Sequence, residues 1–270
     1  MSSTHSAKIY ASINRVTIEI TVRIFCYPKL RICRLGSSSL IVIICIWFIR
    51  SIQLENLTKT FGQDTVLKGV TRNFERGKIH GIVGNNGSGK TVMFKCICGF
   101  LQPTDGHVIV NGKQIGKDID FPEDIGIIIE SPGFLPQFSG LKNLEILAGL
   151  KRKISLKQVA AAIRRVGLDP MTTKPVGKYS LGMRQRLGIA QAIMEEPSLM
   201  ILDEPMNGLD KYGVAEMRQL FQSLARDGRT ILLASHNIQD IETLCDTVCE
   251  MDAGVMTMIR ETPLKEGTSS

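Results

Sequence analysis

The sequence feature that most constrains the fold is a glycine-rich octapeptide set between an apolar run and a helical pattern. Residues 79–83, before it, predict a buried strand, and residues 92–98, after it, predict a helix. Glycines at three of the eight positions permit a tight turn that a residue with a Cβ makes less easily. The octapeptide consists of Gly84, Asn85, Asn86, Gly87, Ser88, Gly89, Lys90 and Thr91. A strand, a tight turn and a helix in succession are typical of an α/β fold.

The same octapeptide predicts a binding site for phosphate groups. Backbone N–H groups of such a turn converge at the N-terminus of a helix, where the helix dipole also favours an anion. Lys90 can then reach the outer phosphates, and the hydroxyl of Thr91 can bind Mg²⁺. The alternative is a chance glycine-rich turn, which the strand before it and the helix after it disfavour. We therefore expect a nucleoside triphosphate and Mg²⁺ at this loop.

The charge of the chain is concentrated at its beginning. The 270 residues carry a net charge of +7. Residues 1–50 hold seven basic residues and one acid, which gives +6 and leaves +1 for all the rest. The main part of the chain is therefore nearly neutral and has no nucleic-acid signature. The seven cysteines, an odd number without the spacing of a secreted scaffold, favour reduced thiols in a cytosol.

The first fifty residues differ from the rest of the chain and contain the apolar run 40–49. Ten residues of helix span about 15 Å, too short for a hydrocarbon core of about 30 Å. A signal peptide is disfavoured because no small-residue cleavage site follows the run. Two interpretations remain, namely an anchor in the membrane interface and an extension without a function. We favour the second, because no amphipathic period is visible.

Residues 51–260 are expected to form one large domain, followed by a loose polar tail over 261–270. Apolar and polar residues alternate over 52–57, and residues 66–74 suggest a second strand, so an antiparallel layer is predicted beside a parallel core sheet. Helical patterns over 143–150, 156–166 and 183–194 fill the block 134–196. The predicted fold class is thus α/β, with a parallel core sheet, an N-terminal antiparallel β subdomain and a helical insertion.

Polar residues end three of the predicted core strands. Glu130 follows the apolar run 125–129, and Asp203 and Glu204 follow the run 199–202. His236 comes after the run 230–234, with one residue between them. Open α/β sheets bind ligands at the carboxyl ends of their strands. Asp203 suits Mg²⁺ and Glu204 suits a base that orients water. For His236 a core or capping role is the alternative, and for Phe61, placed in a turn, base stacking and core packing remain equally open.

The order of these pieces, over residues 52–258, resembles the nucleotide-binding subunit of ATP-binding cassette transporters. The stretch Tyr-Ser-Leu-Gly-Met-Arg-Gln-Arg over 179–186 resembles the signature of that family, although Leu181, Met183 and Arg184 differ from its commoner Gly, Gly and Gln. The resemblance implies a second anion site, in which Ser180, Gly182 and a helix N-terminus contact the γ-phosphate held by another subunit.

The family resemblance also implies a role for each matching position. Phe61 would stack on adenine, residues 84–92 would hold the phosphates, and Ser180, Gly182 and Met183 would complete the ATP site of a partner. The implied metal ligands are Thr91, Asp203 and Glu130, with Glu204 as general base and with Lys90 and His236 at the γ-phosphate. Two departures change the site, since Val92 replaces a Thr or Ser and Glu130 replaces a Gln.

Variants of three motifs, over 129–134, 179–186 and 203–210, resemble the bacitracin and lantibiotic-resistance branch of this family. The branch implies an ATPase that powers export of, or immunity to, a peptide antibiotic. It further implies a dimer of cassettes, expected to be a homodimer, and a separate integral-membrane permease that docks near 131–143. The chain would then lie peripherally on the cytoplasmic face of the cell membrane.

Two alternatives stay in view. A soluble cassette ATPase acting on ribosomes or DNA is disfavoured by the single cassette and the nearly neutral main domain. A non-catalytic regulator gated by ATP would need broken catalytic positions, whereas Lys90, Asp203, Glu204 and His236 are all present.

Overall fold

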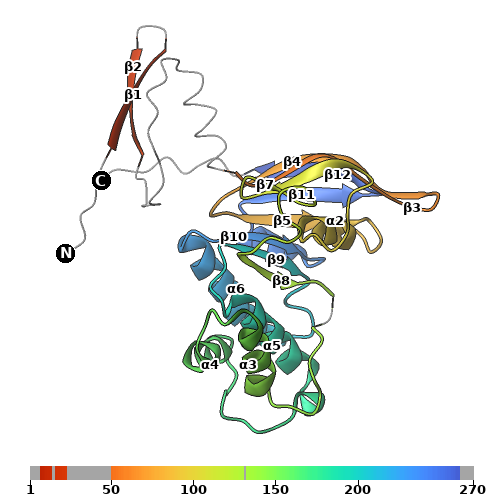
Figure 1. The fold of residues 1–270 in the computed structure, drawn as a ribbon, viewed down its shortest axis with the longest axis vertical. Coiled ribbons are helices and arrows are strands. Elements are labelled where there is room, and N and C mark those ends of the chain that lie inside the picture. The colour runs from red at the N-terminus through yellow and green to blue at the C-terminus, as the bar shows by residue number, and fades with distance from the viewer. Residues whose placement is uncertain (1–6, 14–15, 23–49, 131, 262–270) are drawn as a thin grey trace. The chain divides into compact units, whose positions relative to one another are not determined.

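The structure, a computed structural model, describes residues 7–13, 16–22, 50–130 and 132–261 (Figure 1). The chain divides into two compact units, residues 1–49 and residues 50–270. In the first unit, β1 (Ala7–Ile13) and β2 (Val16–Val22) form an antiparallel hairpin. The apolar run 40–49 and all of the C-terminal tail except Glu261 lie outside the described residues.

The second unit begins with an antiparallel sheet whose strand order is β4-β3-β6-β7. In its centre Ile52 pairs with Phe74 on one side and with Val110 on the other, and all three side chains are buried. This sheet confirms the antiparallel layer expected from the alternating pattern. Its strands are β3 (Arg50–Phe61), β4 (Asp64–Glu75), β6 (Asp105–Val110) and β7 (Lys113–Gln114).

A six-stranded sheet with the order β12-β11-β5-β10-β9-β8 forms the core. All neighbouring strands in it are parallel except β11 and β12, which form an antiparallel pair. Parallel strands bring their carboxyl ends to one edge, so β5, β8, β9 and β10 all end on the same side. The strands are β5 (Ile79–Val83), β8 (Ile125–Ile128), β9 (Leu199–Asp203), β10 (Thr230–Ala234), β11 (Thr247–Asp252) and β12 (Val255–Glu261).

Side-chain alternation along the core strands divides the interior into two hydrophobic clusters. Leu199 and Ile201 of β9 pack with α2 (Lys90–Ile97) and the antiparallel sheet, whereas Met200 and Leu202 pack with α5 (Leu181–Ile193) and α6 (Lys211–Arg226). Successive residues of a strand point to opposite faces, which explains the division. Helix α2, which follows the glycine-rich loop, is therefore held by apolar contacts within one cluster that includes strands of both sheets.

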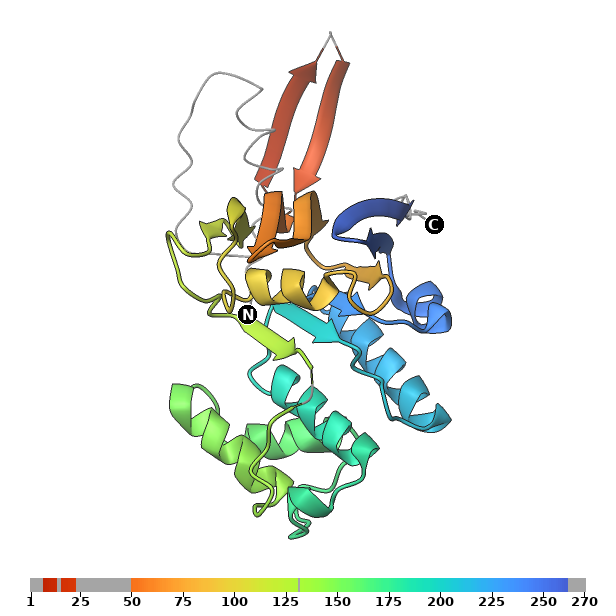
Figure 2. The same ribbon diagram turned by 90° about the vertical axis from the view of Figure 1, so that its right-hand side faces the viewer.

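Helices α3, α4 and α5 come between β8 and β9 in the chain and lie together at one end of the unit in both ribbon views (Figures 1 and 2). The hydroxyl oxygens of Ser139 and Ser180 accept backbone N–H groups at the starts of α3 and α5, and Ser155 forms a capping box with Gln158 at α4. The helices are α3 (Gly140–Lys151), α4 (Leu156–Arg165), α5 (Leu181–Ile193), α6 (Lys211–Arg226) and α7 (Ile238–Leu244), with a short 3₁₀ turn at Val176–Lys178.

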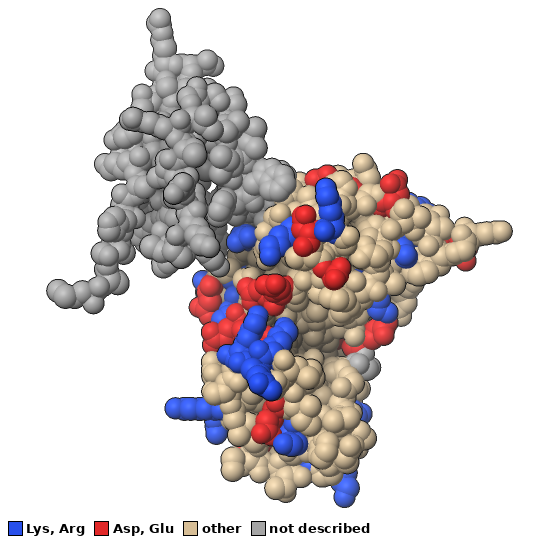
Figure 3. All heavy atoms as spheres, in the orientation of Figure 1, with Lys and Arg blue, Asp and Glu red and all other residues tan. Residues whose placement is uncertain are grey.

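Acidic and basic side chains are interspersed on the face of the second unit drawn in Figure 3, where Lys and Arg lie among Asp and Glu. Mixed charge of this kind agrees with the nearly neutral composition of residues 51–270. Across the described part of the chain, none of the helices combines the length and the apolar character needed to cross a bilayer.

Candidate active site

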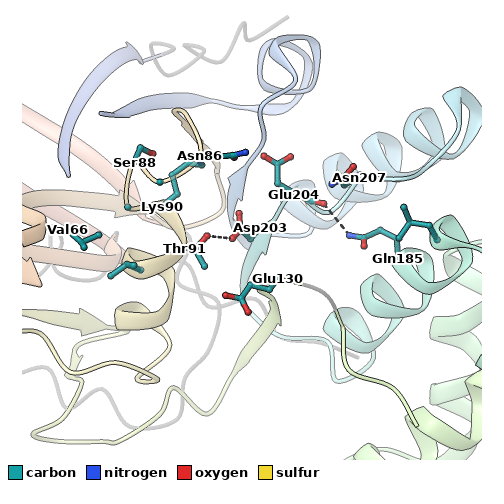
Figure 4. A pocket seen from close by; sticks show the side chains of 14 residues that line it. Val66, Asn86, Ser88, Lys90, Thr91, Glu130, Gln185, Asp203, Glu204 and Asn207 are labelled. Carbon is teal, nitrogen blue, oxygen red and sulfur yellow. Dashed lines mark hydrogen bonds between the residues drawn. The ribbon is translucent and has the colours of Figure 1, made fainter. Parts of the chain in front are cut away.

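The carboxyl ends of the parallel core strands surround a cavity of about 610 Å³ (Figure 4). This volume lies within the range of about 300–1,000 Å³ that is usual for small-molecule sites. The loop after β5 contributes residues 86–89 and the first turn of α2 contributes residues 90–92. Strand β8 leads to Glu130, and β9 ends at Asp203, which Glu204 follows. Figure 4 shows these side chains, drawn from distant parts of the sequence, turned toward one space.

The glycine-rich loop has a conformation that requires glycine. Gly84 has a φ of 149°, and a Cβ placed on it would overlap the backbone carbonyl oxygen of Met251. Gly87 has a φ of 80°, and a Cβ there would meet no atom within 4 Å, so this side of the loop is open. Gly89, the residue before α2, has no side chain, so no cap occupies the backbone N–H groups in the first turn of the helix. The N-terminus of α2 is thus able to receive an anion.

Two polar side chains of the loop fit a phosphate group. The hydroxyl oxygen of Ser88 is buried and has no hydrogen-bond partner, which is costly unless something else supplies one. Lys90 is 8% exposed, and its Nζ donates to the carbonyl oxygens of Gly84 at 2.7 Å and Asn85 at 3.0 Å. The ammonium group therefore lies folded against the loop, beside the place where phosphates would bind.

A hydroxyl and a carboxylate suited to Mg²⁺ meet at the base of the cavity. Oγ1 of Thr91, in the first turn of α2, donates to Oδ2 of Asp203 at 2.7 Å. Burial raises the pKa of Asp203, while the hydrogen bond from Thr91 and the charge of Lys90 oppose that rise. Hard oxygen donors of this kind are the ligands that Mg²⁺ prefers. Thr91 and Asp203, both predicted as metal ligands, are 112 positions apart in the sequence and in direct contact in the structure.

Glu130 lies on another wall of the cavity, just beyond the end of β8. Its backbone has a φ of 61°, which is uncommon for a residue other than glycine. Oε1 of Glu130 lies 2.6 Å from Nζ of Lys95, one helical turn after Thr91. The carboxylate predicted as a metal ligand is therefore paired with an ammonium group.

Glu204 and His236 form a second acid–base contact at the ends of β9 and β10. Oε2 of Glu204 lies 2.8 Å from Nδ1 of His236, whose ring is largely exposed. Glu204 has a φ of 49°, and its backbone N–H donates to the carbonyl oxygen of Ala234 at 2.9 Å. This bond ties the backbone of Glu204 to the neighbouring strand and turns its side chain toward the cavity.

Two residues that sequence reasoning did not include also belong to the site. Gln185 of α5 is buried, and its amide donates to the carbonyl oxygens of Pro205 at 2.9 Å and Glu204 at 3.3 Å. The sequence signal that could have identified Gln185 is a polar residue on the buried face of α5. For Lys95 the signal was a basic residue four positions after Thr91, on the same face of α2.

Some predicted site residues lie apart from the cavity. Phe61 is not among the described residues that line it; its ring is 45% exposed and faces Nζ of Lys59 at 5.1 Å. Ser180, Gly182 and Met183 are likewise outside that lining, and Oγ of Ser180 accepts the N–H of Met183 at 3.2 Å. Leu181 does line the cavity, and the absence of a side chain at Gly208 makes room for it.

A family model described as "ABC transporter" matches residues 67–207. The ABC transporter ATP-binding protein YybJ of Bacillus subtilis is 43% identical over 203 residues, which cover 75% of this chain and 93% of that protein. The bacitracin transport ATP-binding protein BcrA of Enterococcus faecalis is 43% identical, with 75% of this chain and 67% of that protein covered. The lantibiotic transport ATP-binding protein SrtF of Streptococcus pyogenes is 34% identical, with coverage of 78% and 90%.

Among solved structures, the fold is similar to that of the ATP-binding cassette MJ0796, determined as a dimer in a post-hydrolysis state with ADP and Pi bound. The TM-score is 0.69 at 24% identity, and the match covers 77% of this chain and 99% of that one. At this identity the similarity supports the fold alone, and it agrees with the α/β architecture described above.

Proposed function

The chain belongs to the ATP-binding cassette (ABC) transporter family as an ATP-hydrolysing subunit, and we propose that it powers the movement of a peptide antibiotic or similar amphipathic molecule through a separate permease. The cargo is inferred from relatives that are named for bacitracin and lantibiotic transport. One observation supports the proposal: the glycine-rich loop, the Thr91–Asp203 pair and the Glu204–His236 pair meet at one edge of the core sheet.

ATP is proposed to bind with its phosphates against the glycine-rich loop. Residues 84–92 would surround the phosphates, Ser88 would gain the hydrogen-bond partner that it lacks, and Lys90 would turn from the loop carbonyls toward the outer phosphates. Val92 offers no hydroxyl there, so we expect one contact fewer than a Thr or Ser would give. Phe61, which lies outside the cavity proposed to hold the phosphates, would stack on adenine.

Thr91 and Asp203 would hold Mg²⁺, with Glu130 near enough to add a ligand or to bind a metal-bound water. When bound, the metal would supply positive charge that stabilises the phosphoryl oxygens during transfer. Glu204 would orient the attacking water and accept its proton. Lys90 and His236 would contact the γ-phosphate, where negative charge is spread in the transition state.

The site needs a second cassette, which we propose to be another copy of this chain. Ser180, Gly182 and Met183 lie at the N-terminus of α5 but outside the cavity of their own chain. A helix N-terminus with a serine hydroxyl suits an anion. In a head-to-tail dimer it would contact the γ-phosphate held by the partner, and a single chain would hydrolyse ATP slowly.

The permease is proposed to dock on the loop between Glu130 and α3. The side chain of Asn143 is buried and bonds to both the N–H and the carbonyl oxygen of Leu135, at 2.7 and 3.1 Å. This clamp leaves Leu135 and Phe138 exposed, at 44% and 36%. An apolar surface on a loop held by these hydrogen bonds suits a membrane partner, so the chain would lie peripherally at the cytoplasmic face.

We also propose a division of the chain by role. Residues 51–260 would act as the cassette, and its helical part over 134–196 would carry the permease contact. Residues 1–50 would be an extension that the ATPase does not need, and 261–270 a loose tail. A chain that begins at Ser51 should keep full ATPase activity and membrane association, and loss of either would contradict this division.

Affinity purification of the full chain from membranes solubilised in mild detergent tests the function. We expect an integral-membrane protein to co-purify and to raise the rate of phosphate release from ATP, with the same preparation of Lys90→Ala as the inactive control. Co-purification of ribosomal RNA or DNA in place of a membrane protein would instead support a soluble ATPase that acts on those partners. Failure to bind ATP in the presence of Mg²⁺ would overturn both.

A further inference from the structure

Helix α2 presents two functional groups on one face, a single turn apart. Thr91 and Lys95 are four residues apart, so their side chains lie on the same side of the helix. Thr91 bonds to Asp203, and Lys95 reaches across to Glu130, whose Oε1 lies 2.6 Å from Nζ. One helix face thus contacts the carboxylate of Asp203 at the end of β9 and that of Glu130, two residues beyond β8.

The Lys95–Glu130 pair is too exposed to contribute much to folding. Its side chains are 31% and 64% exposed. Ion pairs of this kind stabilise proteins by about 0–1 kcal/mol. The main consequence of the pair is therefore the position of the Glu130 charge, because the carboxylate stands on the wall of a cavity proposed to hold a triphosphate.

The charges of Lys95 and Glu130 both affect the pKa of Asp203 at the proposed metal site. Burial has the largest effect on the pKa of Asp203 and raises it; Glu130 raises it further, whereas Lys95 lowers it. The ammonium group of Lys95 thus opposes the effect of the Glu130 carboxylate on Asp203. Lys90 does not form an ion pair with Glu130, because its ammonium group is bonded to the carbonyl oxygens of Gly84 and Asn85.

We propose that Lys95 is a positioning residue that holds the Glu130 carboxylate on the wall of the cavity and neutralises it until metal and nucleotide have bound. The inference rests on the proposed binding of ATP at this site. It explains how a carboxylate is tolerated at a position where the family resemblance implies a neutral Gln. The pair gives the cavity the net charge that a Gln would give, while it keeps an oxygen ligand within reach.

The proposal predicts how nucleotide affinity depends on metal. Without Lys95 the free carboxylate repels a metal-free triphosphate, so affinity in EDTA falls. A bound divalent cation offsets the same charge, so affinity in Mg²⁺ changes little. The ratio of the two dissociation constants, metal-free over metal-bound, should therefore rise by about fivefold in Lys95→Met.

The experiment measures binding of trinitrophenyl-ATP to the full chain by fluorescence, in EDTA and in Mg²⁺. It compares the natural chain with Lys95→Met, Glu130→Gln and the double variant. If Lys95 acts through Glu130, Lys95→Met raises the ratio in the natural background and leaves it unchanged in the Glu130→Gln background. An equal effect in both backgrounds, or no effect in either, would overturn the proposal.

Three controls separate this result from simpler causes. Lys95→Arg keeps the charge and should keep the natural ratio, and Lys95→Gln, which also removes the charge, replaces Lys95→Met if that variant does not fold. Lys142→Met breaks a similar exposed pair, with Glu145 at 3.0 Å on α3, and should leave the ratio unchanged. If the natural chain bound no nucleotide even in Mg²⁺, the proposed function would fail, whereas an unaltered ratio with normal Mg²⁺-dependent binding would remove only the role of Lys95.

Discussion

Oε2 of Glu204 lies 2.8 Å from Nδ1 of His236, a contact that joins the ends of two neighbouring core strands across 32 residues of sequence. The backbone supports it, because the N–H of Glu204 donates to Ala234, two residues before His236. A carboxylate held in this way is oriented before any substrate arrives, which is what a group that positions water requires.

Glu204→Gln should therefore separate binding from hydrolysis. We expect the rate of phosphate release to fall at least about 100-fold, because the amide cannot accept a proton, while Mg²⁺–ATP binding stays within about twofold. The ATP-bound variant should also elute as a stable dimer in size-exclusion chromatography. Turnover at the natural rate would remove Glu204 from the role of general base.

Gln185→Leu should loosen the loop that carries Glu204. The substitution removes the donor to the buried carbonyl oxygen of Pro205 and to the partly buried one of Glu204, at a cost of about 1–3 kcal/mol. We expect a lower free energy of unfolding in urea and a lower turnover rate at saturating ATP. Gln191→Leu, the same change further along α5, is the control, and an equal effect there would show that the loop contacts do not matter.

Gly84→Ala should destabilise the chain more than a glycine substitution in an open turn. The new methyl group would overlap the carbonyl oxygen of Met251, so the backbone must shift, and we expect a loss of about 3 kcal/mol in the free energy of unfolding. Gly62 has a φ of 59° and no atom within 4 Å of an added Cβ. Gly62→Ala should thus cost only about 1 kcal/mol. Equal losses in the two variants would contradict the close approach at Gly84.

His80 should make stability depend on pH. Its ring is buried, with Nε2 2.9 Å from the carbonyl oxygen of Glu75 and Nδ1 2.7 Å from Oγ1 of Thr247. A carbonyl oxygen only accepts, so Nε2 carries the proton of the neutral ring and Nδ1 accepts from the hydroxyl. Burial, the largest influence, lowers the pKa of His80 below its usual value of 6.5.

Because the unfolded chain takes up the His80 proton first as pH falls, the stability associated with the neutral ring is complete above about pH 6.5 and is lost progressively toward the lower pKa of the folded state. The contribution to the slope should approach about 1.4 kcal/mol per pH unit at most. Urea unfolding at several pH values between 5 and 8 checks this, and His80→Gln should give a flatter curve. An unchanged slope in that variant would assign the pH dependence to other groups.

Much of the fold follows from local patterns. The runs that form β9 and β10 are almost entirely apolar, β5 is apolar apart from His80, and the alternating run 52–57 lies within an antiparallel strand. Serine residues mark the starts of α3, α4 and α5. The residues that make up each of these signals lie close together in the chain, so the sequence alone is enough to predict these elements.

The sequence by itself determined the glycine-rich loop, the polar residues at the ends of the core strands and the α/β class, because each depends on neighbours along the chain. Only the tertiary structure decided which of those residues touch. The order β5-β10-β9-β8 brings Thr91 to Asp203 and Glu204 to His236, and the face of α2 brings Lys95 to Glu130. Strand order and helix packing arise from burial of apolar surface across the whole domain, which no short stretch of sequence records.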